Sequence, residues 1–126
     1  MSTGNITISE AELEIMKVLW EAENAVTSIE IGEKVEKHGW KKTTIATFLT
    51  RLCEKGAVKA EKKGGKLYYY TAVIPAEDYR KTKTKNLIQS LYHGSAKELA
   101  ASLFSDGNLS PEDIAELRSI FDERND

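Results

Sequence analysis

Three amphipathic helical segments followed by a glycine-containing hairpin constrain the fold of this chain more than any other feature. Two of the helices begin at capping boxes, in which a Ser or Thr and a Glu three residues later satisfy each other's free backbone groups: Ser9 with Glu12, and Thr27 with Glu30. We expect helices over about 10–23, 28–37 and 43–55, with glycines 39 and 56 ending the last two. Residues 1–8 are expected to form a loose arm.

A β-hairpin is predicted directly after the third helix. Residues 57–62 and 66–73 are rich in residues that favour strands, and they flank Lys63-Gly64-Gly65, which suits a tight primed turn. Three helices and a hairpin with a basic tip follow the order of a winged helix-turn-helix, in which the third helix enters the major groove and the wing contacts phosphates. A small α+β domain with a basic surface is the alternative fold that this pattern leaves open.

The third helix has two contrasting faces. One is an apolar stripe at helical spacing, made of Ile45, Phe48, Leu49, Leu52 and Cys53. The other is rich in threonine, a mediocre helix former whose hydroxyl and methyl groups can contact phosphates and base edges. This second face is the predicted DNA-reading surface. It consists of Thr43, Thr44, Thr47, Thr50 and Arg51, with Lys42 added for its charge beside the helix start.

Charge is strongly segregated along the chain, although the net charge is only −2. Residues 34–85 hold 14 Lys and Arg against 5 Asp and Glu, whereas the remaining residues hold 4 against 15. A basic middle indicates an anionic partner such as DNA phosphate, and the wing lysines are the predicted contacts: Lys62, Lys63 and Lys66. The alternatives are a solvated basic surface and, for Arg51, an ion pair with Glu36 or Glu54.

The chain after residue 74 is predicted to be helical, over about 76–92, 95–104 and a last helix that begins at Pro111 after the cap Ser110. About 50 residues are thin for an independent core. The apolar stripes could pack on the N-terminal domain, but we expect them to pack against a second copy in a two-fold homodimer. The predicted dimerisation residues are Tyr79, Leu87, Ile88, Leu91, Leu99, Leu103, Phe104, Ile114, Leu117, Ile120 and Phe121.

The expected organisation is therefore a mostly α (α+β) fold, with a winged-helix domain over 1–74 and a helical dimerisation domain over 75–126. We expect no secretory signal, because residues 1–8 have no basic start and no apolar stretch. The sequence has no apolar run long enough to span a membrane and contains a single cysteine, Cys53. We expect a cytoplasmic protein with no membrane partner. We expect no enzyme, cofactor or metal, because catalytic motifs are missing and His38 and His93 stand apart.

Two further alternatives remain at this point. Tyr68, Tyr69 and Tyr70 could stack on bases, as in proteins that bind single strands, but sheet residues packed on the helices are expected. The C-terminal helices could be the working surface of a protein-interaction module whose basic middle meets an acidic protein.

Several segments carry a resemblance to a known family. They are residues 8–16 with Leu19-Trp20, then Gly39-Trp40, Thr44-Ile45, Thr47, Arg51-Leu52 and Lys55-Gly56, the tyrosines of the wing, and Leu109-Ser110 with Glu116-Leu117-Arg118. The chain resembles the penicillinase-repressor and methicillin-resistance-repressor family of bacterial transcription regulators. The resemblance implies a C-terminal dimerisation domain, repression at a palindromic double-stranded operator, and DNA contacts at Thr43, Thr44, Thr47 and Arg51. Trp40 is expected to fix the turn into the third helix.

The chain departs from the family pattern at identifiable positions. β-Lactam-induced relatives are inactivated when a protease linked to a sensor cuts an Asn-Phe bond, whereas the matching bond here is Leu103-Phe104. The possible cleavage region is therefore Ser102, Leu103 and Phe104. Copper-responsive relatives carry a C-terminal cysteine cluster, which this chain lacks. Ala46 stands where relatives often carry a longer polar side chain, so we expect a different operator preference.

Overall fold

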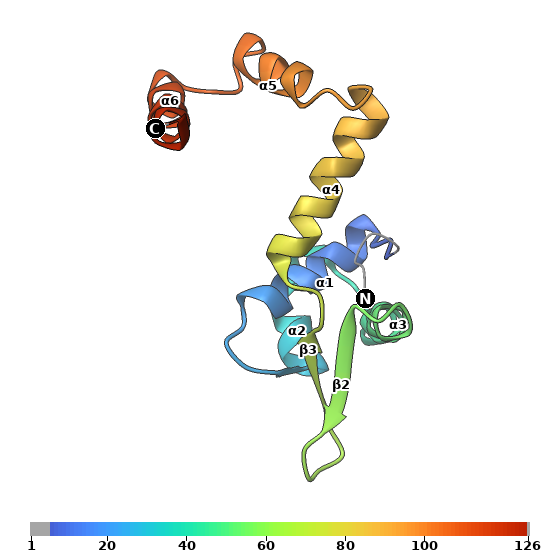
Figure 1. The fold of residues 1–126 in the computed structure, drawn as a ribbon. Helices are drawn as coiled ribbons and strands as arrows, with labels where there is room; N and C mark the ends of the chain where they lie inside the picture. The colour runs from blue at the N-terminus through green and yellow to red at the C-terminus, as the bar shows by residue number, and fades with distance from the viewer. Residues whose placement is uncertain (1–5, 126) are drawn as a thin grey trace. The chain divides into compact units, whose positions relative to one another are not determined.

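The computed structural model describes residues 6–125, and their side chains as far as residue 124. The elements follow in the order α1 (Glu10–Glu21), β1 (Val26–Thr27), α2 (Ser28–Lys34), a 3₁₀ turn (Glu36–His38), α3 (Lys42–Glu54), β2 (Val58–Lys62), β3 (Tyr68–Ala72), α4 (Ala76–Leu91), α5 (Ala96–Ser105) and α6 (Pro111–Asn125) (Figure 1). The predicted mostly helical class with a small sheet is confirmed. None of the described helices is both long and apolar enough to cross a membrane.

Both predicted capping boxes are formed. The Ser9 hydroxyl accepts from the backbone N–H of Glu12 at 3.1 Å, and the Glu12 carboxylate accepts from the backbone N–H of Ser9 at 2.9 Å. Thr27 and Glu30 form the same reciprocal pair at the start of α2. These boxes satisfy N–H groups that the first helical turn leaves free, and thereby fix where the two helices begin.

The sheet has an additional strand that the sequence did not indicate. Its order is β1-β3-β2, all antiparallel, with Val26 opposite Tyr70 and Thr27 opposite Tyr69. Two residues are too few to show the alternation by which a strand is recognised, and Thr27 is also the cap of α2. The short strand joins the α1–α2 connection to the wing.

The expected tight Gly-Gly turn of the wing is wrong. Lys62 is opposite Tyr68, so the loop comprises residues 63–67. A primed two-residue turn of type I′ needs positive φ at both central residues, whereas only Gly64 of the glycine pair has it, at 78°. The hairpin extends well beyond helices α1 to α3 and carries its basic tip away from them (Figure 1).

The core of the N-terminal part lies where α1, α2 and α3 meet the base of the wing. Ile15, Met16, Ile31 and Leu52 are completely buried, and Leu49 is 1% exposed. The expected loose arm is corrected over the residues that the structure describes. Ile8 is buried and Ile6 packs against the core, because these apolar side chains cover its open edge. Residues 1–5 lie outside the described residues.

The chain divides into two compact units, unit 1 over Met1–Thr82 and unit 2 over Lys83–Asp126, so the division falls within α4 rather than before it. The first turn of α4 belongs to unit 1. Tyr79 is only 7% exposed, and its ring centroid lies 5.6 Å from that of Trp20. Trp20 donates its ring N–H to the carbonyl of Ile74 at 2.8 Å. The Tyr79 side chain thus completes the core of its own unit and leaves little surface for the predicted dimer interface.

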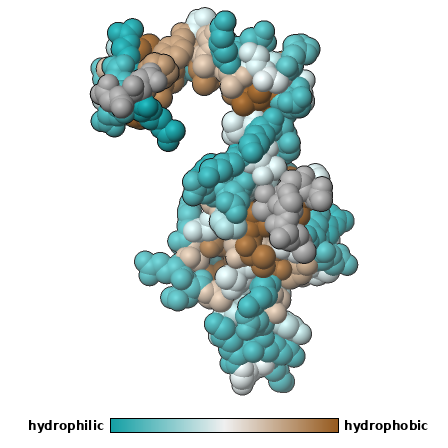
Figure 2. All heavy atoms as spheres, in the orientation of Figure 1, coloured by the Kyte–Doolittle hydropathy of each residue, from teal (hydrophilic) through white to brown (hydrophobic). Residues whose placement is uncertain are grey.

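Unit 2 contains the rest of α4 together with α5 and α6. The predicted cap Ser110 forms a reciprocal pair with Asp113 at the start of α6, and Ser95 caps α5. Among residues 83–124 no side chain is buried, and hydrophobic residues lie at the surface of this unit (Figure 2). The large exposed ones are Leu87, Leu91, Leu103, Phe104, Leu117, Ile120 and Phe121, while Ile88, Leu99 and Ile114 are half-buried.

Candidate nucleic-acid interface

The outward face of α3 is the face that the sequence singles out. Ile45, Leu49 and Leu52 are buried against α1 and α2, which turns the opposite side of the helix toward solvent. Thr44 is half-buried and is the least accessible member of the predicted set. The remaining members are exposed: Lys42, Thr43, Thr47, Thr50 and Arg51. Their role as DNA contacts stays a prediction, but the surface that it requires is present.

The chain enters α3 through an aromatic stack. Gly39 has a left-handed φ of 66°, which reverses the chain after the 3₁₀ turn. The Trp40 ring then lies parallel to the His38 ring, with centroids 4.4 Å apart and 12° between their planes. Its edge meets Phe48 at 5.1 Å and 72°. Trp40 is partly buried against the core, and these contacts give it the expected role of fixing the turn into α3.

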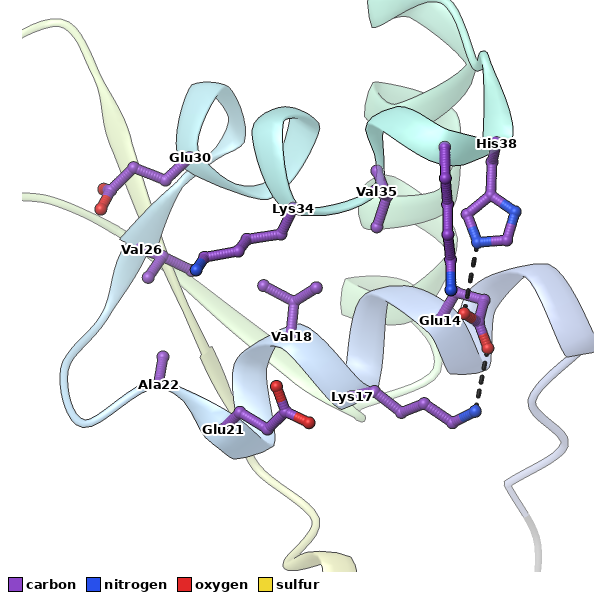
Figure 3. Close-up of a pocket in the computed structure, with 11 residues that line it drawn as sticks. Glu14, Lys17, Val18, Glu21, Ala22, Val26, Glu30, Lys34, Val35 and His38 are labelled. Atoms are coloured by element: carbon purple, nitrogen blue, oxygen red, sulfur yellow. Dashed lines mark hydrogen bonds and ion pairs between the residues drawn. The ribbon is translucent and has the colours of Figure 1, made fainter.

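A charged pocket lies between α1 and α2, and its lining includes His38, the residue that stacks on Trp40. The cavity measures about 450 Å³ and is lined by residues of both helices, with Glu14 between Lys17 and His38 (Figure 3). The Glu14 carboxylate lies 3.0 Å from the Lys17 ammonium and 3.2 Å from the His38 ring nitrogen. Hydrogen bonds from Lys17 and His38 lower the pKa of Glu14. Glu14 thereby links α1 to the residue that stacks on Trp40.

The first turn of α3 differs from that of every other described helix. It contains no acidic residue and has no side-chain cap, whereas the others each begin with at least one Asp or Glu. Exposed Lys41 and Lys42 stand there instead, at the end of the helix dipole that disfavours cations. Free N–H groups beside two ammonium groups form a surface suited to an anion. Lys41 was absent from the predicted set, and the missing acidic residue is the signal that identifies it.

The threonine hydroxyls are already engaged with the helix. Thr47 donates to the carbonyl of Thr43, and Thr50 donates to the carbonyl of Ala46, each at 2.9 Å. A hydroxyl has a single hydrogen to donate, so in this conformation both present lone pairs and a methyl group outward. They suit the amino groups of adenine or cytosine and the methyl of thymine better than the acceptor oxygens of phosphate.

Arg51 provides free hydrogen-bond donors on this face. Over the described part of the chain it forms no ion pair, so the alternative pairing with Glu36 or Glu54 is absent. The side chain is exposed and carries five N–H groups in a planar fork, which matches the two acceptors of a guanine edge or the oxygens of a phosphate.

Two lysines of the wing place their ammonium groups over tyrosine rings. The ammonium of Lys62 lies 5.1 Å from the Tyr68 ring centroid, and that of Lys63 lies 5.5 Å from the Tyr69 ring centroid. Tyr70 is half-buried against the core, as expected for a sheet residue, whereas Tyr68 is 47% exposed. Tyr68 nevertheless lines a pocket with Leu49, Thr50 and Cys53 of α3, so it lies beside that helix although nearly half of it is exposed.

Cys53 lies half-buried on the inner side of α3, beside Leu49 and Tyr70. Burial raises the pKa of the Cys53 thiol, which keeps it protonated near neutral pH and a poor nucleophile or metal ligand. Over residues 6–125 no group of three or more His, Cys, Asp or Glu side chains is gathered so that it could hold a metal ion.

The possible cleavage region lies inside α5. The Ser102 hydroxyl donates to the carbonyl of Leu99 at 2.8 Å and lies 3.2 Å from the hydroxyl of Tyr92. Leu103 and Phe104 are exposed, but their peptide groups are within the helix. Whether a protease cuts there stays a prediction.

Comparison with known protein sequences gives matches over nearly the whole chain. The family model of the penicillinase repressor matches residues 8–123. The chain is 35% identical to the penicillinase repressor of Bacillus licheniformis, over 92% of this chain and 90% of that protein. It is 31% identical to the methicillin resistance regulatory protein MecI of Staphylococcus aureus strain N315, over 98% of this chain and all of MecI.

Solved structures give the same result for the N-terminal part. The DNA-binding domain of the repressor BlaI is 38% identical, with a TM-score of 0.53, and the match covers 63% of this chain and 94% of that one. Monomeric Bacillus licheniformis BlaI, solved in complex with the blaP half-operator, is 39% identical with a TM-score of 0.50, over 58% of this chain and 88% of that one. Together with the whole-length relatives, these matches show that the chain belongs to the penicillinase repressor family of DNA-binding transcriptional repressors.

Proposed function

We propose that this chain represses transcription by occupying a palindromic operator in duplex DNA as a homodimer. In this proposal α3 enters the major groove and the wing contacts phosphates. The observation that carries it is the exposed face of α3. There Arg51 has free hydrogen-bond donors, and the short threonine side chains allow the helix to lie close to base edges. The family favours this function over that of a protein-interaction module.

Each part of the surface has a distinct role in this proposal. Arg51 reads an acceptor edge such as that of guanine, and the threonine methyl groups contact thymine. Lys41 and Lys42, with the uncapped first turn of α3, hold a phosphate. Lys62, Lys63 and Lys66 neutralise phosphates farther along the duplex. Because the partner is DNA, we propose that the protein acts in the cytoplasm.

Replacing Arg51 tests the base-reading role. For Arg51→Ala we expect a loss of about 1–3 kcal/mol in operator binding, confined to one base position, since a bidentate pair has about that value. Arg51→Lys keeps the charge but not the planar fork, so it should keep the salt dependence and still lose the base preference. Binding measured on duplexes altered at single positions checks this. Full activity of Arg51→Lys would contradict base reading and indicate a phosphate contact.

Replacing the wing lysines tests the phosphate-binding role. The triple variant Lys62→Gln, Lys63→Gln and Lys66→Gln should bind all duplexes more weakly. The slope of log affinity against log salt should become shallower by about 0.9 for each phosphate that the wing no longer neutralises. Fluorescence anisotropy at several salt concentrations measures this slope. Lys97→Gln, in α5, is the control and should leave it unchanged, whereas an unchanged slope in the triple variant would rule out phosphate binding by the wing.

The exposed apolar surface of unit 2 supports the proposed homodimer. This unit has no buried side chain among residues 83–124, yet its helices carry Leu103, Phe104, Leu117, Ile120 and Phe121 at the surface. An apolar surface of this kind is stabilised when a partner removes it from water. A second copy presents the same side chains, and a two-fold axis would present two α3 helices to the two halves of a palindrome.

Replacing residues of α6 tests the dimer. The double variant Ile120→Ala and Phe121→Ala should sediment as a monomer at concentrations where the unaltered chain is a dimer, because it removes apolar contact area. Tyr79→Ala is the matched control: it should lower the free energy of unfolding of unit 1 by about 3 kcal/mol while leaving the dimer intact. Dissociation caused by Tyr79→Ala, or a monomeric unaltered chain, would contradict the assignment.

Release of the operator by a sensor-linked protease is the last part of the proposal. Because residues 102–104 lie in α5, cleavage requires that helix to unwind first. Ala101→Gly should therefore increase the rate at which thermolysin cuts before Leu103 or Phe104, whereas Ala115→Gly in α6 should not. Mass spectrometry locates the cut, and sedimentation should show that the cut chain is monomeric. A cut chain that remains dimeric would rule out this mode of release.

A further inference from the structure

We propose that Lys55 and Glu12 act as a positioning pair that sets the orientation of α3 and hence the discrimination between operator and other DNA. This inference rests on the proposed function. It assigns a role in DNA reading to two residues that lie away from the exposed threonine face.

Lys55 and Glu12 form a connection across the carboxyl-terminal end of α3, which we call the strap. Lys55 directly follows Glu54, the last residue of the helix, and its ammonium donates to the Glu12 carboxylate at 2.6 Å and to the carbonyl of Thr7 at 2.7 Å. The Glu12 side chain is 2% exposed. One lysine therefore joins the carboxyl-terminal end of α3 both to α1 and to the segment that precedes α1.

Glu12 is held in its charged form at this buried place. Burial by itself would raise the pKa of Glu12, but hydrogen bonds from Lys55 and Ser9 outweigh that effect and keep the pKa below its usual value. A buried charge is tolerated only when it is paired and hydrogen-bonded, and here Lys55 supplies the opposite charge. The carboxylate is thus a fixed anchor for the lysine.

The fold has other means of joining α1 to α3. Ile15 and Met16 of α1 and Leu49 and Leu52 of α3 are buried in one core. Such apolar contacts are strong but non-directional, so they allow small rotations and shifts of a helix. A charged hydrogen bond between fixed groups adds the directional constraint that the apolar core lacks.

The strap acts on the turn that presents Arg51. The backbone N–H of Lys55 donates to the carbonyl of Arg51 at 3.0 Å, so the two residues are one helical turn apart. A bidentate contact with a base edge depends on the position and tilt of the guanidinium. Removing the contacts that Lys55 makes with Glu12 and Thr7 should therefore impair base reading by Arg51 while leaving contacts with phosphate intact.

The test compares the unaltered chain with Lys55→Met, Lys55→Arg and the double variant Glu12→Met with Lys55→Met. The double variant replaces the buried ion pair with apolar side chains, a change that commonly preserves folding, and thermal melting should confirm this. The specific probe is the duplex that the unaltered chain selects from a random-sequence pool, and a duplex of mixed sequence is the non-specific one.

We expect the ratio of specific to non-specific affinity to fall about tenfold in the double variant, with an unchanged salt slope. Lys55→Arg should restore most of the ratio. In an Arg51→Ala background the double variant should cause no further loss, because the strap works through Arg51. A folded double variant with an unchanged ratio would show that the pair is purely structural.

Two other outcomes would overturn the inference in different ways. A shallower salt slope would mean that Lys55 contacts DNA directly, and a loss that adds to that of Arg51→Ala would mean that the pair does not act through Arg51. An unaltered chain that selects no duplex from the pool would overturn the proposed function, and the positioning role with it. If the unaltered chain discriminates and the variants discriminate equally well, only the positioning role fails.

Discussion

The burial of one side of α3 is the constraint on which the rest of the structure depends. Ile45, Leu49 and Leu52 can leave water only by packing against α1 and α2, and this packing determines which residues of the helix remain outside. The position of the threonines relative to these leucines along a helix of 3.6 residues per turn places Thr43, Thr47 and Thr50 on the solvent side. The same contacts that stabilise the domain thus create its candidate DNA-reading surface.

Local rules of helix stability are followed through most of the chain and relaxed at this surface. α1 and α2 begin with complete capping boxes, whereas α3 begins with Lys41 and Lys42 and has no side-chain cap. Threonine hydroxyls bonded to the preceding turn are also unfavourable within a helix. A departure from the favoured pattern at a surface where a ligand would bind is the arrangement expected of a functional site.

The sequence predicted the elements with strong local signals and missed those that depend on distant contacts. Capping pairs and helical periodicity identified the helices, and the spacing on α3 identified its exposed face. β1 was missed because its pairing with Tyr69 and Tyr70 lies far along the chain. The burial of Tyr79 in its own unit was missed because the apolar stripe of α4 continues from one unit into the other, and its contact with Trp20 has no local signal. The turn of the wing was misjudged because register, which residue spacing alone does not determine, sets its length.

The exposed hydrophobic surface of unit 2 affects how operator occupancy by such a regulator depends on the concentration of the protein. If two chains must associate before either side of a palindrome is bound well, operator occupancy depends on the square of the free chain concentration when dimers are scarce. A modest fall in the number of intact chains then empties the operator more than proportionally. The exposed leucines and phenylalanines of α5 and α6 would thus make transcription a steep function of protein supply.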